Sequence, residues 1–308
     1  SMIFDFFENV SRNQAGGRDL SDFLPAVIDE IDDRYHKGEP DLVTGVPTRF
    51  TEIDKMTSGL QKGDLIIVAG RPSMGKTAFA INIAENVAID AQQPVIIFSM
   101  EMSGKKLSYR MLSSIGKVHG HALRTGQLDD EHWHGLTLAT AKLSDAKIHI
   151  DDTPGLTALD IRTRTRRFVR RHGGEIGLVV VDYIQLLSTQ ASAEGNRAYE
   201  VGEISRSLKN LARELKVPVV ALSQLSRKVE ERVNKRPMMS DLRESGSLEQ
   251  DADVIMLLYR DEYYNPDSEF KGVAEVNVAK QRDGATGVVS LAFRGEFSRF
   301  ENLSPRNA

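Results

Sequence analysis

A loop able to wrap around phosphate groups lies at residues 70–77, where the sequence reads GRPSMGKT. It follows the apolar segment Leu65–Ala69 and precedes a helical pattern, which is the context in which such a loop holds a nucleotide. Its backbone N–H groups can turn toward the β-phosphate, Lys76 can reach the β- and γ-oxygens, and the Thr77 hydroxyl can bind Mg²⁺. We therefore expect a site for Mg²⁺ and a nucleoside triphosphate, which we take to be ATP, although the loop by itself does not distinguish among nucleotides. The expected nucleotide contacts in this loop and directly after it are Ser73, Gly75, Lys76, Thr77 and Ala78.

Two carboxylates follow apolar segments that we expect to be strands of one sheet. Asp182 comes directly after Leu178–Val181 and would hold Mg²⁺ through water beside the phosphate loop. Glu101 comes directly after Val95–Met100, the first apolar segment beyond the phosphate-loop helix. An acid at that place can activate the water in line with the γ-phosphate, so Glu101 is the predicted general base of hydrolysis. Thr77 and Asp182 are the predicted metal-binding residues.

An amide side chain follows a third apolar segment, Val217–Leu222. From that position Gln224, together with Ser223, can touch the γ-phosphate and report its hydrolysis. A glutamine at the end of a strand is more often only a surface residue. Its place beside two other segments that end in functional groups favours the catalytic, sensing role.

The apolar segments predict the sheet that would position these groups. They are almost continuously apolar, so both faces should be buried, which indicates a mainly parallel α/β sheet flanked by helices. Apolar residues spaced along 201–215 predict one of the covering helices. A C-terminal β-hairpin is expected from Glu275–Lys280 and Val288–Phe293. The expected strands of the main sheet are Leu65–Ala69, Val95–Met100, Lys147–Asp151, Leu178–Val181, Val217–Leu222 and Val254–Tyr259.

The N-terminal segment differs in pattern from the rest of the chain. Residues 1–18 have no clear period, which is typical of a tether, and apolar residues at spacings of three and four predict a helix over Leu20–Ile31. The breakers at His36–Pro40 should end it. We therefore expect a tether and linker helix at 1–40 and an α/β domain at 41–308. The apolar face of the helix would pack either on its own domain or on a neighbouring subunit.

Composition limits the classes of function. The 308 residues include no cysteine and carry a net charge of −4. Disulfides and thiolate metal sites are therefore impossible, no apolar run is long enough for a membrane span, and we expect a cytoplasmic protein. The charge lacks the basic excess of many DNA-binding domains, so nucleic acid would have to bind at local groups.

Taken together, these segments resemble the replicative DnaB-type DNA helicases, from Asp19 to Leu303. The resemblance implies a RecA-like P-loop NTPase core, a homohexamer that moves along single-stranded DNA in the 5′-to-3′ direction, and primase and a helicase loader as partners. It also implies that the linker helix docks on the adjacent core. We see no departure from the family pattern at a motif position. The segments that carry the resemblance are 70–77, 98–102 (FSMEM), 182–186 (DYIQL), 221–225 (ALSQL), 241–253 (DLRESGSLEQDAD) and 280–282 (KQR).

The resemblance assigns DNA binding to the loop around Arg243, Glu244 and Gly246, which lines the central channel in such helicases. The residue types suit that role, because a loop rich in glycine and serine can offer N–H groups to phosphates while Arg243 supplies a charge. Contacts to the DNA backbone would also explain binding without sequence preference. Alternatively, Arg243 and Glu244 only pair with each other.

The same resemblance assigns nucleotide contacts to residues outside the phosphate loop. Lys280 and Arg282 would reach the γ-phosphate of ATP held by the next subunit, with Arg282 as the arginine finger and Gln281 between them. Arg110 is similar to a nucleotide-contacting residue of the family. A solvent-exposed hairpin would equally display lysine and arginine.

Other readings of the sequence remain open. A RecA-like recombinase shares the core but forms filaments, and a DNA-binding ring could use ATP only for assembly. The arginine-rich helix after Thr157 is expected to be a solvated or subunit-contacting face, since its arginines surround much of the helix. The pairs His119/His121 and His132/His134 are expected to be ordinary loop residues.

Overall fold

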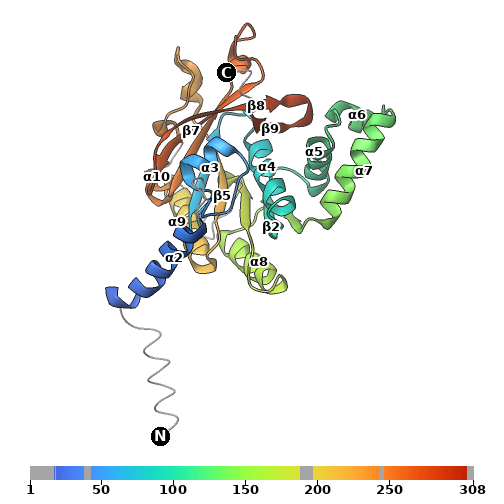
Figure 1. Ribbon diagram of the computed structural model, residues 1–308. Coiled ribbons are helices and arrows are strands. Elements are labelled where there is room, and N and C mark those ends of the chain that lie inside the picture. The colour runs from blue at the N-terminus through green and yellow to red at the C-terminus, as the bar shows by residue number, and fades with distance from the viewer. Residues whose placement is uncertain (1–16, 18, 38–42, 188–196, 243–245, 304–308) are drawn as a thin grey trace. The chain divides into compact units, whose positions relative to one another are not determined.

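The computed structural model describes residues 17, 19–37, 43–187, 197–242 and 246–303. The chain divides into two compact units, Ser1–Leu42 and Val43–Ala308. In the first unit a short 3₁₀ turn, η1 (Leu20–Asp22), precedes the helix α2 (Leu24–Lys37), drawn in blue in Figure 1. The predicted helix therefore exists but starts later than expected. Pro25 explains the delay, because its ring would clash with a carbonyl four residues earlier in a helix that had already begun.

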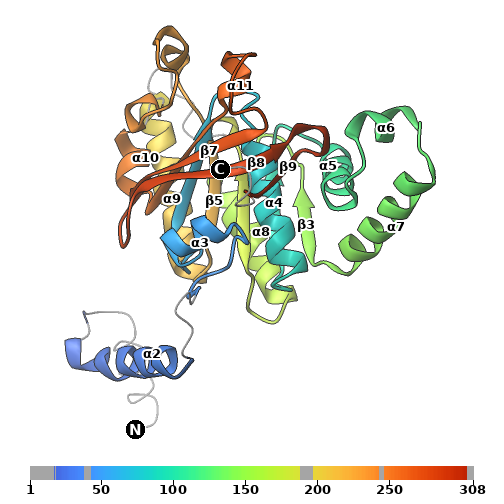
Figure 2. The same ribbon diagram turned by 45° about the horizontal axis from the view of Figure 1, so that its top comes forward.

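The second unit is built on one sheet of nine strands in the order β3-β2-β4-β5-β1-β6-β7-β8-β9. The first six strands are mutually parallel, and β7, β8 and β9 extend the sheet in antiparallel fashion (Figure 2). The mainly parallel sheet and the C-terminal hairpin that the sequence predicts are both present. The strands are β1 (Leu65–Gly70), β2 (Val95–Ser99), β3 (Ile148–Asp151), β4 (Leu178–Asp182), β5 (Val219–Gln224), β6 (Val254–Tyr259), β7 (Val273–Gln281), β8 (Gly287–Arg294) and β9 (Arg299–Asn302).

Two apolar clusters cover the two faces of this sheet. Along β1, Ile66 and Val68 belong to one cluster, and Leu65, Ile67 and Ala69 belong to the other. The first cluster includes side chains of α4 and α5, and the second includes those of α8, α9 and α10. This alternation explains why the strand sequences are apolar at every position.

The helices of the second unit surround the sheet, and α5, α6 and α7 lie together on one side of it (Figure 1). Their bounds are α3 (Thr51–Thr57), α4 (Lys76–Ile89), α5 (Gly104–Gly116), α6 (Gly120–Thr125), α7 (Asp130–Asp145), α8 (Ala158–Arg171), α9 (Arg197–Leu215), α10 (Gly246–Asp251) and α11 (Asp261–Tyr264). Shorter 3₁₀ turns are η2 (Ile184–Leu186), η3 (Arg227–Glu231), η4 (Met239–Asp241) and η5 (Gly295–Phe297).

The arginine-rich helix is α8, capped as expected by Thr157 in a reciprocal pair with Asp160. Some of its arginines form ion pairs with acidic residues of the same domain. Arg162 and Arg166 both pair with Glu214 of α9, and Arg164 pairs with Asp151 at the end of β3. These arginines are therefore not a uniformly solvated face.

The histidine pairs lie at helix starts rather than in loops alone. His119 caps α6, accepting a hydrogen bond from the N–H of His121, and His132 forms a capping pair with Asp129 at the start of α7. Two of the four histidines therefore have a structural explanation in helix capping.

The predicted strand ends differ from the observed ones by one or two residues. Met100 lies outside β2, whereas Asp182 and Gln224 lie inside β4 and β5. β5 begins after Pro218, which has no N–H group to donate to the sheet. β9 is an additional strand that the sequence did not predict, because its four residues, RFEN, contain no apolar run.

Candidate nucleotide-binding site

The parallel strands bring the predicted functional residues to one edge of the sheet. β2, β4, β5 and β1 are neighbours in that order, so their carboxyl ends meet, as in other open α/β sheets that bind ligands. Ser99 is the register partner of Asp182, and Gly70 is the register partner of Gln224. Residues far apart in the sequence therefore converge beside the phosphate loop.

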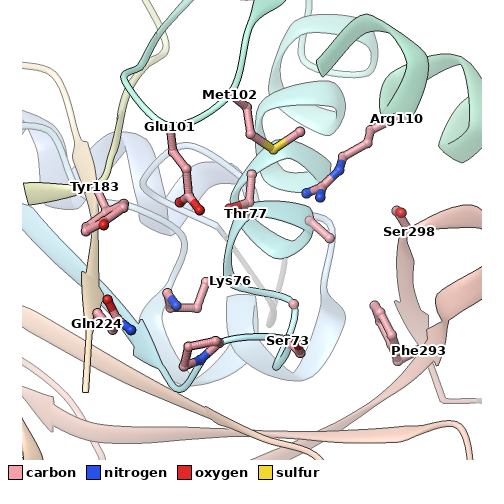
Figure 3. A pocket seen from close by; sticks show the side chains of 13 residues that line it. Ser73, Lys76, Thr77, Glu101, Met102, Arg110, Tyr183, Gln224, Phe293 and Ser298 are labelled. Carbon is pink, nitrogen blue, oxygen red and sulfur yellow. The ribbon is translucent and has the colours of Figure 1, made fainter. Parts of the chain in front are cut away.

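A cavity of about 410 Å³ lies at this edge (Figure 3). The predicted residues of the phosphate loop and of the start of α4 line it, together with one predicted residue each from the turn after β2, from α5 and from β5. These are Ser73, Gly75, Lys76, Thr77, Ala78, Glu101, Arg110 and Gln224.

The phosphate loop owes its shape to Gly75, whose φ is 94°. A side chain there would be strained, and a Cβ would lie 2.9 Å from Cζ of Phe300 in β9. The helix α4 begins at the next residue, Lys76, so its N-terminal N–H groups and dipole face the cavity. The loop and helix together form a site for an anion.

Lys76 and Arg110 supply positive charge from different sides of the cavity (Figure 3). Burial lowers the pKa of Lys76, whereas the carboxylates of Asp182 and Glu101 oppose that shift. Burial likewise lowers the pKa of Arg110 against the same two carboxylates. Both cations thus lie in a partly dehydrated place, where their attraction for phosphate is stronger than in water.

Thr77 and Asp182 form the candidate Mg²⁺ site. The Thr77 hydroxyl donates a hydrogen bond to Oδ2 of Asp182 over 2.9 Å. The pKa of Asp182 is raised to about 6, chiefly by burial and also by the charge of Glu101, while Thr77, Lys76 and Arg110 act in the opposite direction. A hydroxyl and a carboxylate are hard oxygen ligands, which fits Mg²⁺.

Glu101 lies on a turn that two interactions hold in place. The N–H of Met100 donates to the carbonyl of Asp182 over 3.0 Å, and the Ser99 hydroxyl donates to the carbonyl of Met102 over 2.7 Å. The Glu101 carboxylate points into the cavity toward Thr77 (Figure 3). The arrangement places a carboxylate where it can accept a proton from water.

Gln224 is joined to the segment that follows β4. Its N–H donates to Oε1 of Gln185 over 3.4 Å, and Nε2 of Gln185 donates to the Ser223 hydroxyl over 2.9 Å. Gln224 lines the cavity on the side opposite Arg110 (Figure 3). A movement of Gln224 can therefore be transmitted through Gln185 to the segment that follows Asp182.

Sequence reasoning missed several residues that line the cavity. Met102 and Tyr183 directly follow Glu101 and Asp182, so adjacency to a predicted residue was a usable signal. Phe293 and Ser298 come from β8 and from the turn before β9, and only the tertiary fold brings them here. The guanidinium of Arg260 lies over the Phe293 ring, 4.1 Å from its centroid.

The remaining predicted residues that the structure describes do not line this cavity. Lys280 and Gln281 end β7, with Arg282 directly after it, and these three do not line the cavity of their own chain. Gln281 donates to the carbonyl of Met56 over 3.3 Å. Gly246 is the first residue of α10, while Arg243 and Glu244 lie outside the described residues.

Comparison with known proteins places this site in a family. Residues 45–302 match the model of the DnaB-like helicase C-terminal domain. The chain is 53% identical over 300 residues to the replicative DNA helicase DnaB of Geobacillus stearothermophilus, covering 96% of this chain and 65% of the relative. It is 49% identical over 304 residues to DnaB of Haemophilus influenzae, covering 98% of this chain and 64% of the relative. The chain thus spans less than two thirds of these relatives.

Solved structures agree with this placement. The ATPase domain of G40P superposes with a TM-score of 0.88 at 42% identity, over 94% of this chain and 100% of that one. A DnaB-like replicative helicase, described with its interactions with primase, gives a TM-score of 0.85 at 42% identity, over 94% of this chain and 68% of that one. The predicted α/β fold of the RecA-like type is confirmed. No helix in the described part of the chain is long and apolar enough to cross a membrane.

Proposed function

Because this chain belongs to the family of DnaB-like helicase C-terminal domains, we propose that it is the ATP-hydrolysing motor of a replicative DNA helicase. One observation carries the proposal: Lys76, Thr77, Glu101 and Gln224 line a single cavity next to Asp182. We assign residues 1–40 to a tether and linker helix and residues 41–308 to the motor domain. The protein would act in the cytoplasm.

The side chains of the cavity suggest how ATP would be cleaved. The loop N–H groups and Lys76 bind and orient the phosphates, and Glu101 accepts the proton of the attacking water. Thr77 and Asp182 would hold Mg²⁺, which neutralises charge on the β- and γ-phosphates. Arg110 adds a nucleotide contact from α5, and Gln224 would touch the γ-phosphate and respond to its loss.

The site also needs a cation from a second subunit. Lys280, Gln281 and Arg282 lie away from the cavity of their own chain, in keeping with contacts to ATP in the adjacent subunit. An arginine supplied in this way stabilises transition-state charge and contributes a factor of roughly 10³ to 10⁵ in rate. Hydrolysis would then depend on a homohexameric ring.

DNA would bind in the channel of that ring. Arg243, Glu244 and Gly246 are the proposed contacts to single-stranded DNA, with Gly246 at the start of α10. A few groups from each subunit suffice when several subunits face one strand, which accords with a net charge of −4. For the assembled helicase we propose primase and a loader protein as partners.

The direct test compares ATP hydrolysis, with and without single-stranded DNA, and unwinding of a forked duplex. Lys76→Ala and Glu101→Ala should abolish both activities. The first removes the positive charge that binds the phosphates, and the second removes the general base. Lys62→Ala, at an exposed lysine just before β1, is the matched control and should behave as the unaltered protein. Unaltered unwinding by either active-site variant would show that the assignment is wrong.

A further inference from the structure

Lys280 and Arg282 are bound to the C-terminal end of α10. Nζ of Lys280 donates to the carbonyls of Glu249 and Ala252 over 2.5 and 2.7 Å. Nη2 of Arg282 donates to the carbonyl of Gln250 over 2.8 Å. Helix carbonyls at this end lack partners within the helix and carry partial negative charge, so both cations are held by favourable interactions.

Asp253 provides the only carboxylate that pairs with Arg282 in the described part of the chain. Its Oδ1 lies 3.4 Å from Nη1 of Arg282, and its backbone carbonyl accepts the N–H of the same arginine over 3.0 Å. The Asp253 side chain is itself firmly placed. Its Oδ2 accepts the N–H of Leu65 over 2.8 Å and pairs with Nζ of Lys209 over 2.5 Å. Only 4% of Asp253 is exposed.

Arg282 remains accessible despite these contacts, with 47% of its side chain exposed. A guanidinium has five N–H donors in a rigid fork, so one part can hold Asp253 and Gln250 while another binds a phosphate oxygen. A long, exposed arginine otherwise loses much rotamer freedom when it binds. Anchoring the side chain before the nucleotide arrives lowers that cost.

We propose that Asp253 is a positioning residue that sets Arg282 for contact with the nucleotide of the adjacent subunit. The inference rests on the proposed function, in which Arg282 acts on a neighbour's ATP. Asp253 itself would not touch ATP. It fixes the direction of a cation that does.

The same anchor lies close in the chain to the proposed DNA loop. α10 has six residues and starts at Gly246, the last of the three residues assigned to DNA. Its Leu248 is fully buried, and α9 approaches it closely, since a Cβ on Gly202 would lie 2.6 Å from Oγ of Ser247. A shift of the loop that moved this short, packed helix would therefore also move the carbonyls that hold Lys280 and Arg282.

The test compares three variants of the full chain in assembled rings. Arg282→Gln removes the finger, Asp253→Asn removes its anchor, and Asp64→Asn is the matched control. Asp64 lies 3.7 Å from the same Lys209 amine but makes no ion pair with Arg282 among the described residues. Asp253→Asn should lower kcat by roughly 10- to 100-fold with KM for ATP almost unchanged, the scale expected when a catalytic group is misplaced by about 1 Å. Asp64→Asn should change kcat less than about twofold on the same scale.

Mixing experiments separate positioning from a folding defect. An Asp253→Asn subunit keeps an intact phosphate loop, and a Lys76→Ala subunit keeps an intact Arg282. Rings containing both should hydrolyse ATP faster than rings of either variant alone, because the second supplies a well-placed finger to the first. A mere loss of folding in the Asp253→Asn chain would not be repaired by mixing, and that result would overturn the inference.

A companion variant covers the case in which Asp253→Asn alone does not fold. Combining it with Lys209→Met removes both charges of the Asp253–Lys209 pair, so neither member of that pair is left buried without its partner. The combined variant should show the same loss of kcat and the same rescue by Lys76→Ala subunits.

The outcomes distinguish the proposed site between subunits from the proposed role of Asp253. Full activity of Arg282→Gln would overturn the proposed site between subunits, and the inference with it. A low rate for Arg282→Gln, with Asp253→Asn equal to Asp64→Asn, would overturn only the role of Asp253.

Discussion

The Thr77 hydroxyl donates a hydrogen bond to Oδ2 of Asp182 over 2.9 Å, which joins the first turn of α4 to the carboxyl end of β4. The two residues are separated by 105 positions in the sequence. Their contact orients both side-chain oxygens that we propose hold Mg²⁺, so metal binding would need little rearrangement of the protein.

Replacing Asp182 with asparagine should weaken the use of Mg²⁺. The concentration of Mg²⁺ that gives half-maximal ATP hydrolysis is expected to rise by about 10- to 100-fold, the usual effect of losing an outer ligand or its support. The measurement is a Mg²⁺ titration of the hydrolysis rate. Asp151→Asn is the control, since Asp151 also ends a parallel strand but pairs with Arg164 away from the cavity. Equal Mg²⁺ requirements for the two variants would contradict the assignment.

Glu101→Gln should separate binding from cleavage. The variant keeps the size of the side chain but cannot accept a proton, so single-turnover hydrolysis should fall by roughly 10² to 10⁴. Binding of a fluorescent non-hydrolysable ATP analogue should change little. Glu296→Gln is the comparison, because both acids line a neighbouring cavity but only Glu101 also lines the nucleotide cavity. A large loss of nucleotide affinity with an intact cleavage step would refute the role of Glu101 as base.

Gly75→Ala should damage the phosphate loop through two effects. The alanine would be strained at a φ of 94°, and its Cβ would press against Phe300 at 2.9 Å. Gly126→Ala isolates the first effect, since its φ is 73° and nothing lies within 4 Å of the added Cβ. Gly126→Ala should lose only about 1 kcal/mol of stability, whereas Gly75→Ala should lose more and bind nucleotide at least about tenfold more weakly. Calorimetry measures the stability of each variant, and nucleotide titration measures its affinity. Equal losses in Gly75→Ala and Gly126→Ala would count against this account.

Glu85 should make stability depend on pH. Burial raises the pKa of Glu85 to about 7, although Ser114, Arg299 and Asn82 oppose the shift. The folded protein therefore holds this proton more tightly than the unfolded chain, whose value is near 4.5. The stabilisation is complete below about pH 4.5 and is lost as the pH rises to about 7.

Glu85→Gln imitates the protonated form at every pH. Its free energy of unfolding, relative to the unaltered protein, should therefore increase by more than about 1 kcal/mol between pH 5 and pH 8. Urea unfolding at both pH values gives the difference. Glu52→Gln, at an exposed acid of α3, should show no such change. Parallel pH profiles for Glu85→Gln and the unaltered protein would exclude the buried carboxyl as the cause.

The phosphate loop and the sheet were predictable because each rests on local pattern. A strand buried on both faces must be apolar along its length, as Leu65 to Ala69 is. A glycine-rich loop between such a strand and a helix has few explanations other than phosphate binding. Once the strands are parallel, their carboxyl ends must meet. The convergence of Glu101, Asp182 and Gln224 follows from that geometry.

Other features depend on tertiary contacts that leave no local pattern. Phe293 and Ser298 reach the cavity only because β8 and β9 fold back over the phosphate loop. The partners of Arg282 are backbone carbonyls and one buried acid, and carbonyls are present at every position of the sequence. The start of α2 was misplaced because the apolar spacing extends back to Leu20, whereas the helix begins directly before Pro25.

The rate of ATP hydrolysis per subunit, measured against protein concentration with single-stranded DNA present, tests the central claim most directly. A site completed by Arg282 of a neighbour must be inactive in separated subunits, so the rate per subunit should rise steeply as rings assemble. Arg282→Ala should stay near the baseline at every concentration. A constant rate per subunit down to extreme dilution, retained in Arg282→Ala, would contradict a site shared between subunits.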